Sequence, residues 1–343
     1  MSLEQAVTNA WSRNSRWLVL LIPFSWLFSM LSALRRRQLQ NKYQGQPYKA
    51  PVIIVGNITV GGSGKTPLII ALVKALKERG YSPGVVSRGY GGSAVRYPVA
   101  VSSFSAVSES GDEPKLIATL ADCPVVVDAN RPAAVDYLLS RFDCDLVLSD
   151  DGLQHYALHR DIELIVIDGQ QGLGNGRKLP AGPLREARER LVEADMVVVN
   201  GHLDSQAEFA TVSPEQMSIR PTRFRHLQSG RCESVNSWLE SHADKFKQVH
   251  AVAAIGNPQR FANTLSAMGL EVNLHRFDDH QALRLDDITF ADDLPVIITA
   301  KDAIKLTELN LKEQAATANI WVLDIEAVID SALIDKIIVK IKA

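Results

Sequence analysis

Cysteine is scarce in this chain of 343 residues, and the scarcity excludes two kinds of site. The three cysteines, Cys123, Cys144 and Cys232, are an odd number and lack the spacing of metal ligands. A disulfide framework and a cysteine metal centre are therefore not expected, and the thiols should be reduced, as in cytosolic proteins. Internal repeats and low-complexity tracts are also missing.

A strong overall charge is missing as well. The formal net charge is −2, and 46% of the residues are hydrophobic, which is enough to fill a large core. Residues 1–50 contain seven basic residues and one acidic residue, Glu4, whereas the rest of the chain contains 30 basic and 38 acidic residues. Because the basic excess is local, no nucleic-acid partner is predicted. No obligate protein partner is evident either.

The main apolar run, residues 17–34, is a candidate membrane segment flanked by arginines. Eighteen helical residues extend about 27 Å, close to the minimum for crossing a bilayer. Polar residues recur at helical spacing on both sides of Pro23, which predicts two amphipathic helical pieces kinked near that proline. These residues are Gln5, Asn9, Arg13 and Arg16 before the proline and Ser25, Ser29, Ser32 and Arg36 after it.

Three interpretations of this N-terminal segment remain open. The favoured one is an anchor lying in the membrane interface, and the others are a single span and a helix packed on the protein's own core. Positive charge on both flanks gives no orientation, which itself favours lying on the surface. A cleaved signal peptide is not expected, because no small-x-small site precedes the arginine cluster.

From Pro51 to about Gly201 apolar runs alternate with helical patterns. This alternation predicts an α/β fold, a doubly wound and mainly parallel sheet that binds ligands at the carboxyl ends of its strands. The expected strands are 52–55, 84–87, 125–127, 146–148, 164–167 and 196–199, and the expected helices are 68–79, 112–120, 131–141 and 184–191.

A second, smaller α/β series follows an irregular stretch with β-like pieces around residues 216–227. Its expected strands are 248–254, 271–274, 296–299 and 321–323, and its expected helices are 259–268, one from Asp302 and 332–341. We therefore expect three parts, with uncertain boundaries: a membrane-associating helix over 1–40, a nucleotide-binding domain over 41–201 and a C-terminal domain over 202–343.

The glycine-rich stretch after the first strand is the main functional signal. A buried strand, a glycine-rich turn, Gly-Lys-Thr and a helix follow one another, as in phosphate-binding loops whose N–H groups converge on phosphate oxygens. The loop residues are Thr59, Val60, Gly61, Gly62, Ser63, Gly64, Lys65 and Thr66. Lys65 would reach the terminal phosphates, and Thr66 would ligate Mg²⁺. The general pattern requires glycine at position 59, so a plain strand-to-helix turn stays open as the alternative.

Carboxylates follow two further segments. Asp150 and Asp151 end an apolar run and are candidate Mg²⁺ ligands, although Asp-Asp-Gly is also a common turn. Asp112 precedes a helical pattern, where it is either a helix N-cap or a base that accepts a hydroxyl proton. His280 lies far along the chain, and a lone histidine is more often structural. The loops 87–92 and 178–186 carry charged residues. From spacing alone, each loop either binds phosphate or is a plain surface loop.

Taken together, these segments resemble the tetraacyldisaccharide 4'-kinase family, the lipid A 4'-kinases. The motifs run in the family's order and cover nearly the whole chain, including the N-terminal membrane helix. The Thr-Val start of the phosphate loop is the form that this family has. The segments that carry the resemblance are 59–67, 87–91, 111–114, 149–155, 180–186 and 277–280.

The resemblance implies a P-loop kinase-like fold and transfer of the γ-phosphoryl group of ATP, with Mg²⁺, to the 4'-hydroxyl of tetraacyldisaccharide 1-phosphate, giving lipid IVA. It implies that Asp112 is the acceptor-side base paired with His280, and that Thr66, Asp150, Asp151 and Glu186 hold the metal. It places Arg131 and Arg185 near the nucleotide. It also implies work on a lipid substrate at the cytoplasmic face of the bacterial inner membrane. The chain departs from the family at Ala300, where Glu is usual.

Two alternative functions make different predictions. A P-loop ATPase or GTPase switch is the first, but the strings at 200–204 and 299–302 do not match the Asn-Lys-x-Asp motif that reads guanine. A membrane-docked nucleotide-binding protein without an acceptor is the second. It would show no ATP turnover that depends on a lipid acceptor.

Overall fold

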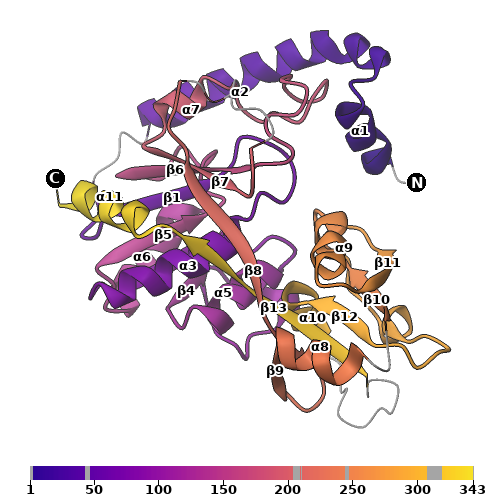
Figure 1. The fold of residues 1–343 in the computed structure, drawn as a ribbon. Helices are drawn as coiled ribbons and strands as arrows, with labels where there is room; N and C mark the ends of the chain where they lie inside the picture. Colours follow the sequence, from indigo (N-terminus) through magenta and orange to yellow (C-terminus); the bar gives the residue numbers. More distant parts are fainter. Residues whose placement is uncertain are drawn as a thin grey trace. The chain divides into compact units, whose positions relative to one another are not determined.

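The structure is a computed structural model that describes residues 3–42, 47–203, 209, 211–243, 247–306 and 319–342 (Figure 1). The chain divides into two compact units. Unit 1 comprises Met1–Arg88, Cys123–Ser218 and Ile329–Ala343, and unit 2 comprises Gly89–Asp122 and Ile219–Val328. Neither unit is continuous in the sequence. The sequence predicts domain boundaries near residues 40 and 201. The two units differ from that prediction, because residues 89–122 belong to unit 2 and the final helix belongs to unit 1.

Unit 1 contains a parallel sheet in the order β7-β6-β1-β5-β2-β4. Every residue of these six strands is buried, as expected for a parallel sheet covered on both faces. The strands are β1 (Val52–Gly56), β2 (Pro83–Ser87), β4 (Val125–Val127), β5 (Leu146–Asp150), β6 (Ile162–Asp168) and β7 (Met196–Asn200). The six strands that the sequence predicts for this region are all present, and the observed strands are equal to the predicted ones or longer by one to three residues.

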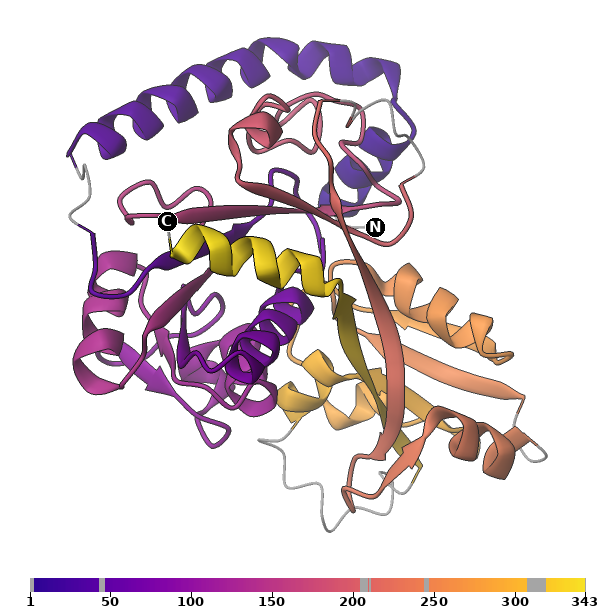
Figure 2. The ribbon, with the colours of Figure 1, turned by 60° about the vertical axis from the view of Figure 1, so that its left-hand side comes forward.

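Helices cover the unit 1 sheet. Two of them, α3 (Lys65–Glu78) and α11 (Ser331–Ile341), lie alongside each other although they are far apart in the sequence (Figure 2). A third, α6 (Arg131–Arg141), packs on β2 and β4. The buried residues of α3 recur at helical spacing, and they are Leu68, Ile69, Leu72, Val73 and Leu76. The apolar periodicity of the sequence therefore fixes which face of α3 meets the sheet.

The strand order creates a switch point beside β1. The chain leaves β1 towards β2 on one side of the sheet, whereas it leaves β6 towards β7 on the other side. The loops that follow β1 and β6 therefore diverge, and ligands of open α/β sheets bind at such a point. The glycine-rich loop follows β1 directly.

One helix expected in unit 1 is wrong. Residues 184–191 were expected to be helical, but only α7 (Arg190–Glu193) is a helix there. Leu184 instead forms a bridge with Thr59, and the Arg185 N–H donates to the Ile58 carbonyl at 2.7 Å. Pairing with the phosphate loop thus overrides the helical pattern of this segment.

The N-terminal segment is helical, as expected, but its break lies elsewhere. It consists of α1 (Leu3–Ser12), the 3-10 helix η1 (Arg16–Leu21) and α2 (Ile22–Lys42). The helix is interrupted at residues 13–15, where Asn14 has a φ of 47°, rather than near Pro23. Pro23 lies in the first turn of α2, where hydrogen bonding changes from the 3-10 to the α pattern and its missing N–H is tolerated.

The polar edge of α2 faces the loop before α7, in the rest of unit 1. Ser25 is buried and joins two backbone groups of the loop before α7: its hydroxyl donates to the Lys178 carbonyl at 2.9 Å and accepts from the Ala181 N–H at 3.1 Å. Arg36 pairs with Glu193 at 2.7 Å, and the Trp11 indole donates to the Pro180 carbonyl at 3.0 Å. The N-terminal helices are therefore attached to the rest of unit 1 by polar contacts.

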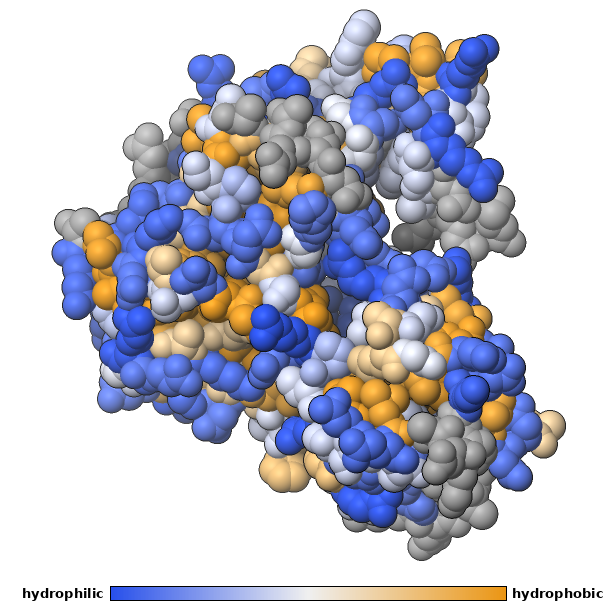
Figure 3. Space-filling view, in the orientation of Figure 1, coloured by the Kyte–Doolittle hydropathy of each residue, from blue (hydrophilic) through white to orange (hydrophobic). Residues whose placement is uncertain are grey.

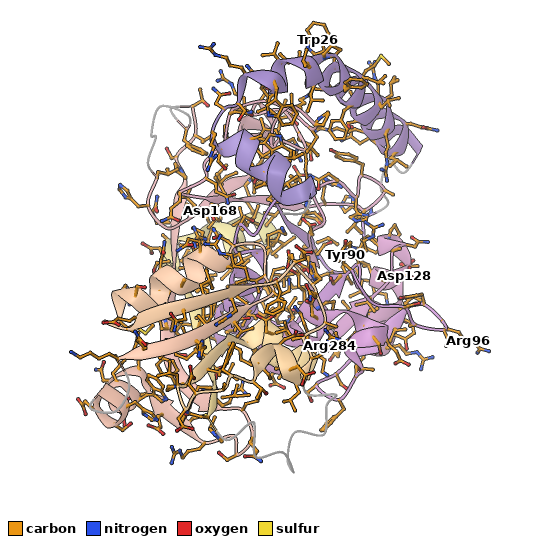
Figure 4. All side chains as sticks on the ribbon, turned by 90° about the vertical axis from the view of Figure 1, so that its right-hand side faces the viewer. Trp26, Tyr90, Arg96, Asp128, Asp168 and Arg284 are labelled. Carbon is orange, nitrogen blue, oxygen red and sulfur yellow. The ribbon has the colours of Figure 1, made fainter. Side chains whose placement is uncertain are left out.

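The apolar face of the same helices is exposed (Figure 3). Leu20 is 76% exposed and Trp26 is 72% exposed, and Trp26 points away from the body of unit 1 (Figure 4). The other exposed apolar residues are Trp17, Val19, Phe24, Leu27, Met30, Leu31 and Leu34. By length and composition alone, residues Arg16–Gln40 are sufficient to cross a membrane. An exposed apolar surface of this kind is typical of a membrane or partner contact.

Unit 2 contains strands in the order β11-β10-β12-β13 followed by β8, with β9 antiparallel to β8. The strands are β8 (Glu215–His226), β9 (Cys232–Ser234), β10 (Gln248–Ala253), β11 (Glu271–Arg276), β12 (Val296–Thr299) and β13 (Ile320–Ile329), and β8 and β13 each have one end in unit 1. A short strand, β3 (Val99–Val101), also belongs to this unit. The helices are α4 (Val107–Ser110), α5 (Asp112–Leu120), α8 (Val235–Ala243), α9 (Pro258–Ala267), η3 (Leu285–Ile288) and α10 (Ala300–Leu306).

The packing of α10 against α5 is the feature of unit 2 that matters for function. Residues 89–122 supply α5, while α10 comes from the C-terminal part of the chain. Both helices begin next to charged side chains: Asp112 and Glu113 open α5, and Lys301 and Asp302 lie in the first turn of α10. Their packing brings these charges together.

Candidate functional site

The phosphate loop of unit 1 runs from β1 into α3, as the sequence predicts. Gly64 is the N-cap of α3 and has a φ of 94°, a backbone conformation that side chains rarely adopt. A Cβ at this position would lie 2.5 Å from the Asn200 amide nitrogen, so the site also lacks room for one. The helix therefore starts at Lys65, and its first N–H groups face the loop.

Two neighbouring segments fix the shape of the loop. The Asn200 side chain, at the end of β7, donates to the Ser63 carbonyl at 3.1 Å. The Val60 N–H donates to the Pro183 carbonyl at 2.9 Å, which engages one of the N–H groups expected to bind phosphate. The Ser63 hydroxyl is buried and has no hydrogen-bond partner among the described residues. A ligand oxygen in the loop would satisfy that hydroxyl.

Asp150 and Asp151 lie where β5 ends, one strand away from the phosphate loop. Val55 in β1 pairs with Asp150 in β5, so the aspartates and the loop emerge at the same edge of the sheet. Asp150 is buried, and its Oδ2 accepts from the Ser87 hydroxyl at 3.0 Å. Asp151 has a left-handed backbone, with a φ of 45°, a conformation that Asp tolerates better than most residues.

Asp151 is held between two cations. Its Oδ1 lies 3.5 Å from the Lys65 Nζ, and its Oδ2 lies 3.3 Å from the Arg185 Nη1. Burial favours a higher pKa for the Asp151 carboxyl, but Lys65 and Arg185 outweigh burial and lower its pKa. The carboxylate is therefore ionised, and both cations occupy positions beside the phosphate loop.

Arg131 binds the backbone that carries this cluster. It is 1% exposed, and its guanidinium donates to the carbonyls of Asp150 at 2.7 Å and of Asp128 at 3.1 Å. Burial lowers the pKa of Arg131 to about 10, although Asp150 and Asp151 oppose the shift. Among the described residues its Nε has no hydrogen-bond partner. Arg131 thus fixes the backbone that carries the aspartates.

Glu186 occupies a buried network beside the loop. Its Oε1 accepts from the Gln154 amide at 2.7 Å, and its Oε2 lies 3.3 Å from the Arg190 Nε. The Gln154 amide also donates to the Asn57 carbonyl at 3.2 Å, at the start of the phosphate loop. Arg190 is 3% exposed and also binds Glu163. Both oxygens of Glu186 are therefore engaged by protein groups.

The oxygen donors near the loop suit Mg²⁺. No group of three His, Cys, Asp or Glu side chains in the described part of the chain converges as a complete metal cage. Mg²⁺ in phosphoryl-transfer sites is usually held by one or two carboxylates together with phosphate oxygens and water. The Asp150 and Asp151 carboxylates and the Thr66 hydroxyl at the start of α3 are such donors, so the residues present fit the ion.

Unit 2 contains the second cluster, centred on Asp112. Asp112 is 4% exposed, and His280 Nδ1 lies 3.1 Å from its Oδ1 and 3.0 Å from its Oδ2. The N-cap of α5 is Gly111 rather than Asp112, so the N-cap alternative for Asp112 is wrong, although Asp112 Oδ1 still accepts from the Glu113 N–H at 2.8 Å. Folding thus joins two residues that lie 168 positions apart.

Two lysines of α10 flank the same carboxylate. Lys301 Nζ and Lys305 Nζ each lie 3.8 Å from Asp112 Oδ2. Burial favours a higher pKa for Asp112, but the hydrogen bond from His280 and the charges of Lys301, His280 and Lys305 together lower its pKa. The hydrogen bond to Asp112 in turn raises the pKa of His280. The pair is therefore polarised towards an aspartate anion and an imidazolium cation.

Backbone geometry supports the position of His280 and Asp112. His280 has a left-handed backbone, with a φ of 63°, and its ring centroid lies 4.9 Å from that of Tyr90. Gly111 has a φ of 84°, and a Cβ there would lie 2.5 Å from the Tyr90 carbonyl. The glycine therefore allows the loop that carries Tyr90 to approach the start of α5.

Sequence reasoning identified Asp112 and His280 but missed their surroundings. From the sequence alone, Lys301 and Asp302 are only neighbours of Ala300, where the chain departs from the family pattern. Lys305 and Glu113 had no assigned role, although both bind in this cluster. The available signal was a buried strand, β12, followed at once by three charged residues in one helical turn and a half, which are Lys301, Asp302 and Lys305.

Comparison with known proteins gives a consistent result. The sequence model of one family, described as tetraacyldisaccharide-1-P 4'-kinase, matches residues 17–342. A protein of Hahella chejuensis named tetraacyldisaccharide 4'-kinase is 43% identical over 96% of this chain and 95% of its own length. A protein of the same name from Alcanivorax borkumensis is 44% identical over 98% of this chain and 97% of its own length.

A solved structure is similar over nearly the whole chain. It is the crystal structure of LpxK from Aquifex aeolicus in complex with ATP, which is 26% identical in sequence and superposes with a TM-score of 0.73. The match covers 94% of this chain and 99% of the Aquifex protein. The similarity therefore extends over both units.

Proposed function

The chain belongs to the tetraacyldisaccharide-1-P 4'-kinase family, and we propose that its phosphate loop and its Asp112–His280 pair carry out the family's reaction. It is an ATP-dependent kinase of lipid A biosynthesis that uses Mg²⁺. Its acceptor is a lipid, and the group phosphorylated is the 4'-hydroxyl of a tetraacyldisaccharide 1-phosphate. The observation that carries the assignment of residues is the buried carboxylate of Asp112 with His280 Nδ1 at 3.0 Å.

On this proposal unit 1 binds the nucleotide. Lys65 and Arg185 move from Asp151 to the phosphate oxygens, and the Ser63 hydroxyl and the first N–H groups of α3 complete the anion site. Thr66, Asp150 and Asp151 would hold the metal, which would neutralise charge on the phosphates. Arg131 supports Asp150 from the backbone side. Glu186 stays a predicted metal ligand, and it would first have to release Gln154 or Arg190.

Asp112 acts on the acceptor. The hydroxyl oxygen forms a bond to the γ-phosphorus, its proton passes to Asp112, and ADP leaves with the electron pair of the broken P–O bond. A sugar hydroxyl is a weak nucleophile, so alignment with the phosphate supplies much of the rate and the base adds about 10²–10⁴-fold. His280 fixes the orientation of the carboxylate through its hydrogen bonds to both oxygens.

The test is transfer of label from γ-labelled ATP to tetraacyldisaccharide 1-phosphate in detergent. We expect a labelled bisphosphate product, and no labelled product from an acceptor that lacks the 4'-hydroxyl. Acceptor-independent release of phosphate at the same rate with either lipid would instead favour the ATPase switch, and equal labelling of both acceptors would place the reaction at another hydroxyl.

We propose further that the exposed apolar face of η1 and α2 lies on the cytoplasmic surface of the inner membrane. The polar edge of α2 binds the loop before α7, so the apolar residues that remain face away from unit 1. The arginines at 13, 16, 35 and 37 would contact anionic headgroups, at about 1 kcal/mol for each charge near the surface. This arrangement favours a helix lying in the interface over a span.

Two exposed positions allow a test that spares the fold. The double variant Leu20→Glu/Trp26→Glu should release the protein from membranes, because it places two charges on the apolar face without removing buried groups. Val339→Glu, which changes a residue 67% exposed on α11, is the matched control and should stay membrane-bound. Sedimentation of the double variant with membranes would assign the contact to another surface.

A further inference from the structure

We propose that Lys301 and Lys305 are positioning residues of the acceptor base, which keep Asp112 a carboxylate anion and hold it against His280. This inference rests on the proposed function, because it concerns the base of that reaction. Lys301 and Lys305 lie on one face of α10, four positions apart, and both approach Asp112 Oδ2.

Lys301 joins three segments of unit 2 at a single ammonium group. Its Nζ lies 3.1 Å from Glu113 Oε1 in α5 and 3.3 Å from Asp279 Oδ1 in the turn that carries His280, in addition to the 3.8 Å contact with Asp112. Its side chain is 15% exposed. Lys301 therefore sets the distance between the residue before His280 and the residue after Asp112.

Lys305 is more buried than Lys301, and a different set of groups holds it. Its Nζ lies 3.0 Å from Asp302 Oδ1 and donates to the Ala254 carbonyl at 3.0 Å. Asp302 is fully buried and in turn accepts from the Thr299 hydroxyl at 2.7 Å and from the Ala254 N–H at 3.2 Å. The charge of Lys305 is thereby held at one place relative to β10 and β12.

The distances explain why the lysines influence the base without blocking it. At 3.8 Å neither ammonium makes a hydrogen bond to Asp112 Oδ2, so each acts on the carboxylate through its charge. Direct hydrogen bonds to Asp112 come from His280 and from the Glu113 N–H. The lysines thus stabilise the anion while leaving hydrogen-bonding positions of Oδ2 available to a hydroxyl.

The charge state of Asp112 depends on all the charged groups around it. Glu113 lies beside it on α5, Asp279 and His280 lie in the turn after β11, and Lys301, Asp302 and Lys305 lie on α10. Burial alone would lower the pKa of Lys301, but the three acids near it, Glu113, Asp112 and Asp279, outweigh burial and raise its pKa. Lys301 therefore stays charged throughout the pH range of the reaction.

Removing Lys301 leaves the burial of Asp112 less opposed. The pKa of Asp112 should therefore rise, because one of the cations that lower it is gone. In Lys301→Met, kcat should then fall at low pH and recover towards the wild-type value at high pH, with the Michaelis constant for ATP unchanged. Lys301→Arg keeps the charge and should restore most of the activity at low pH.

A second readout does not depend on turnover. Lys301 lowers the pKa of His280, so Lys301→Met should raise it, as measured by NMR of the imidazole, with His280→Gln used to assign the signal among the eight histidines. Arg225→Met is the matched control. It removes a cation from a carboxylate in the same unit, Asp324, which keeps a second cation in Arg223.

The outcomes separate this inference from the proposed function. A fall in kcat of equal size at every pH, with the His280 titration unchanged, would make Lys301 a purely structural residue and overturn the inference. Full turnover by Asp112→Asn would overturn the assignment of the base itself. Loss of turnover in Asp112→Asn together with wild-type behaviour of Lys301→Met at every pH would overturn the inference alone.

Discussion

Asp151 in unit 1 and Asp112 in unit 2 each lie among cations, but the cations are held differently. Among the residues described, Lys65 and Arg185 pair with no carboxylate other than Asp151. Lys301, near Asp112, also binds Glu113 and Asp279, and Lys305 also binds Asp302 and the Ala254 carbonyl. The first set of cations has one anionic partner, and the second set has several.

The number of carboxylate partners determines whether a cation can exchange them for the oxygens of a bound ligand. Lys65 and Arg185 can exchange one carboxylate for phosphate oxygens, which are equally good acceptors of charged hydrogen bonds. Moving Lys301 would take a cation away from three carboxylates, and moving Lys305 would take one away from Asp112 and Asp302. The loss is costly for Asp112 and Asp302, because both are buried. The cations of unit 1 can therefore change partners when a nucleotide binds. The cations of unit 2 should instead stay in place beside Asp112.

Lys65→Ala should be one of the two variants with the largest loss of turnover. It removes the charge nearest the terminal phosphates, and we expect kcat to fall about 10²–10³-fold, as for loss of one group that stabilises transition-state charge. Lys74→Ala, a change of the same type on an exposed face of α3, is the control. Wild-type transfer of label by Lys65→Ala would show that the loop does not bind the transferred phosphate.

Asp112→Asn should lower kcat by about 10²–10⁴-fold, the usual contribution of a general base. The affinity for ATP should stay within about twofold of wild type, because Asp112 belongs to unit 2 and the phosphate loop to unit 1. Asp286→Asn, at an exposed position in η3, controls for the loss of a charge. ATP binding is measured by calorimetry. Weakened binding in Asp112→Asn would show that Asp112, like Asp151, affects the nucleotide, which contradicts the comparison.

Arg185→Gln should weaken ATP binding by about tenfold, the effect of one lost charged hydrogen bond. It leaves Lys65 in place, so turnover at saturating ATP should fall less than in Lys65→Ala. Equilibrium binding and initial rates, measured on one preparation, test both statements. A loss of turnover at saturating ATP as large as that of Lys65→Ala would give Arg185 a role in the transition state.

Asp279→Asn should have the smallest effect, less than about threefold in kcat. Lys301 would keep Glu113 and Asp112 as partners, so the second cluster tolerates the loss of one acid. The same assay across pH provides the measurement. A tenfold loss would show that the several partners of Lys301 do not compensate for one another.

Local patterns in the sequence predicted much of the fold. The bounds of β4, β12, α5 and α6 agree with those expected, because short apolar runs and helical spacing are properties of consecutive residues. The Lys65 loop and the aspartates after β5 were also predicted, since each follows a buried strand directly.

Contacts between distant segments could not be predicted in this way. Leu184 lies in a helical pattern but pairs with Thr59, and Ser25 lies on the polar edge of α2 but is buried against the loop before α7. The position of Lys301 depends on the packing of α10 against α5, which no local pattern records. Local patterns also do not record the division into two units, because each unit is assembled from separated segments of the chain.

The central claim is that the cations of Asp151 serve the nucleotide, whereas those of Asp112 do not. Calorimetric affinity for ADP without metal, in the presence of a chelator, tests it in wild type, Asp151→Asn and Asp112→Asn. Asp151→Asn frees Lys65 and Arg185 for the phosphates and should bind metal-free ADP several-fold more tightly, by roughly 1 kcal/mol. Asp112→Asn should match wild type. Unchanged or weaker binding by Asp151→Asn, or an altered affinity in Asp112→Asn, would contradict the account.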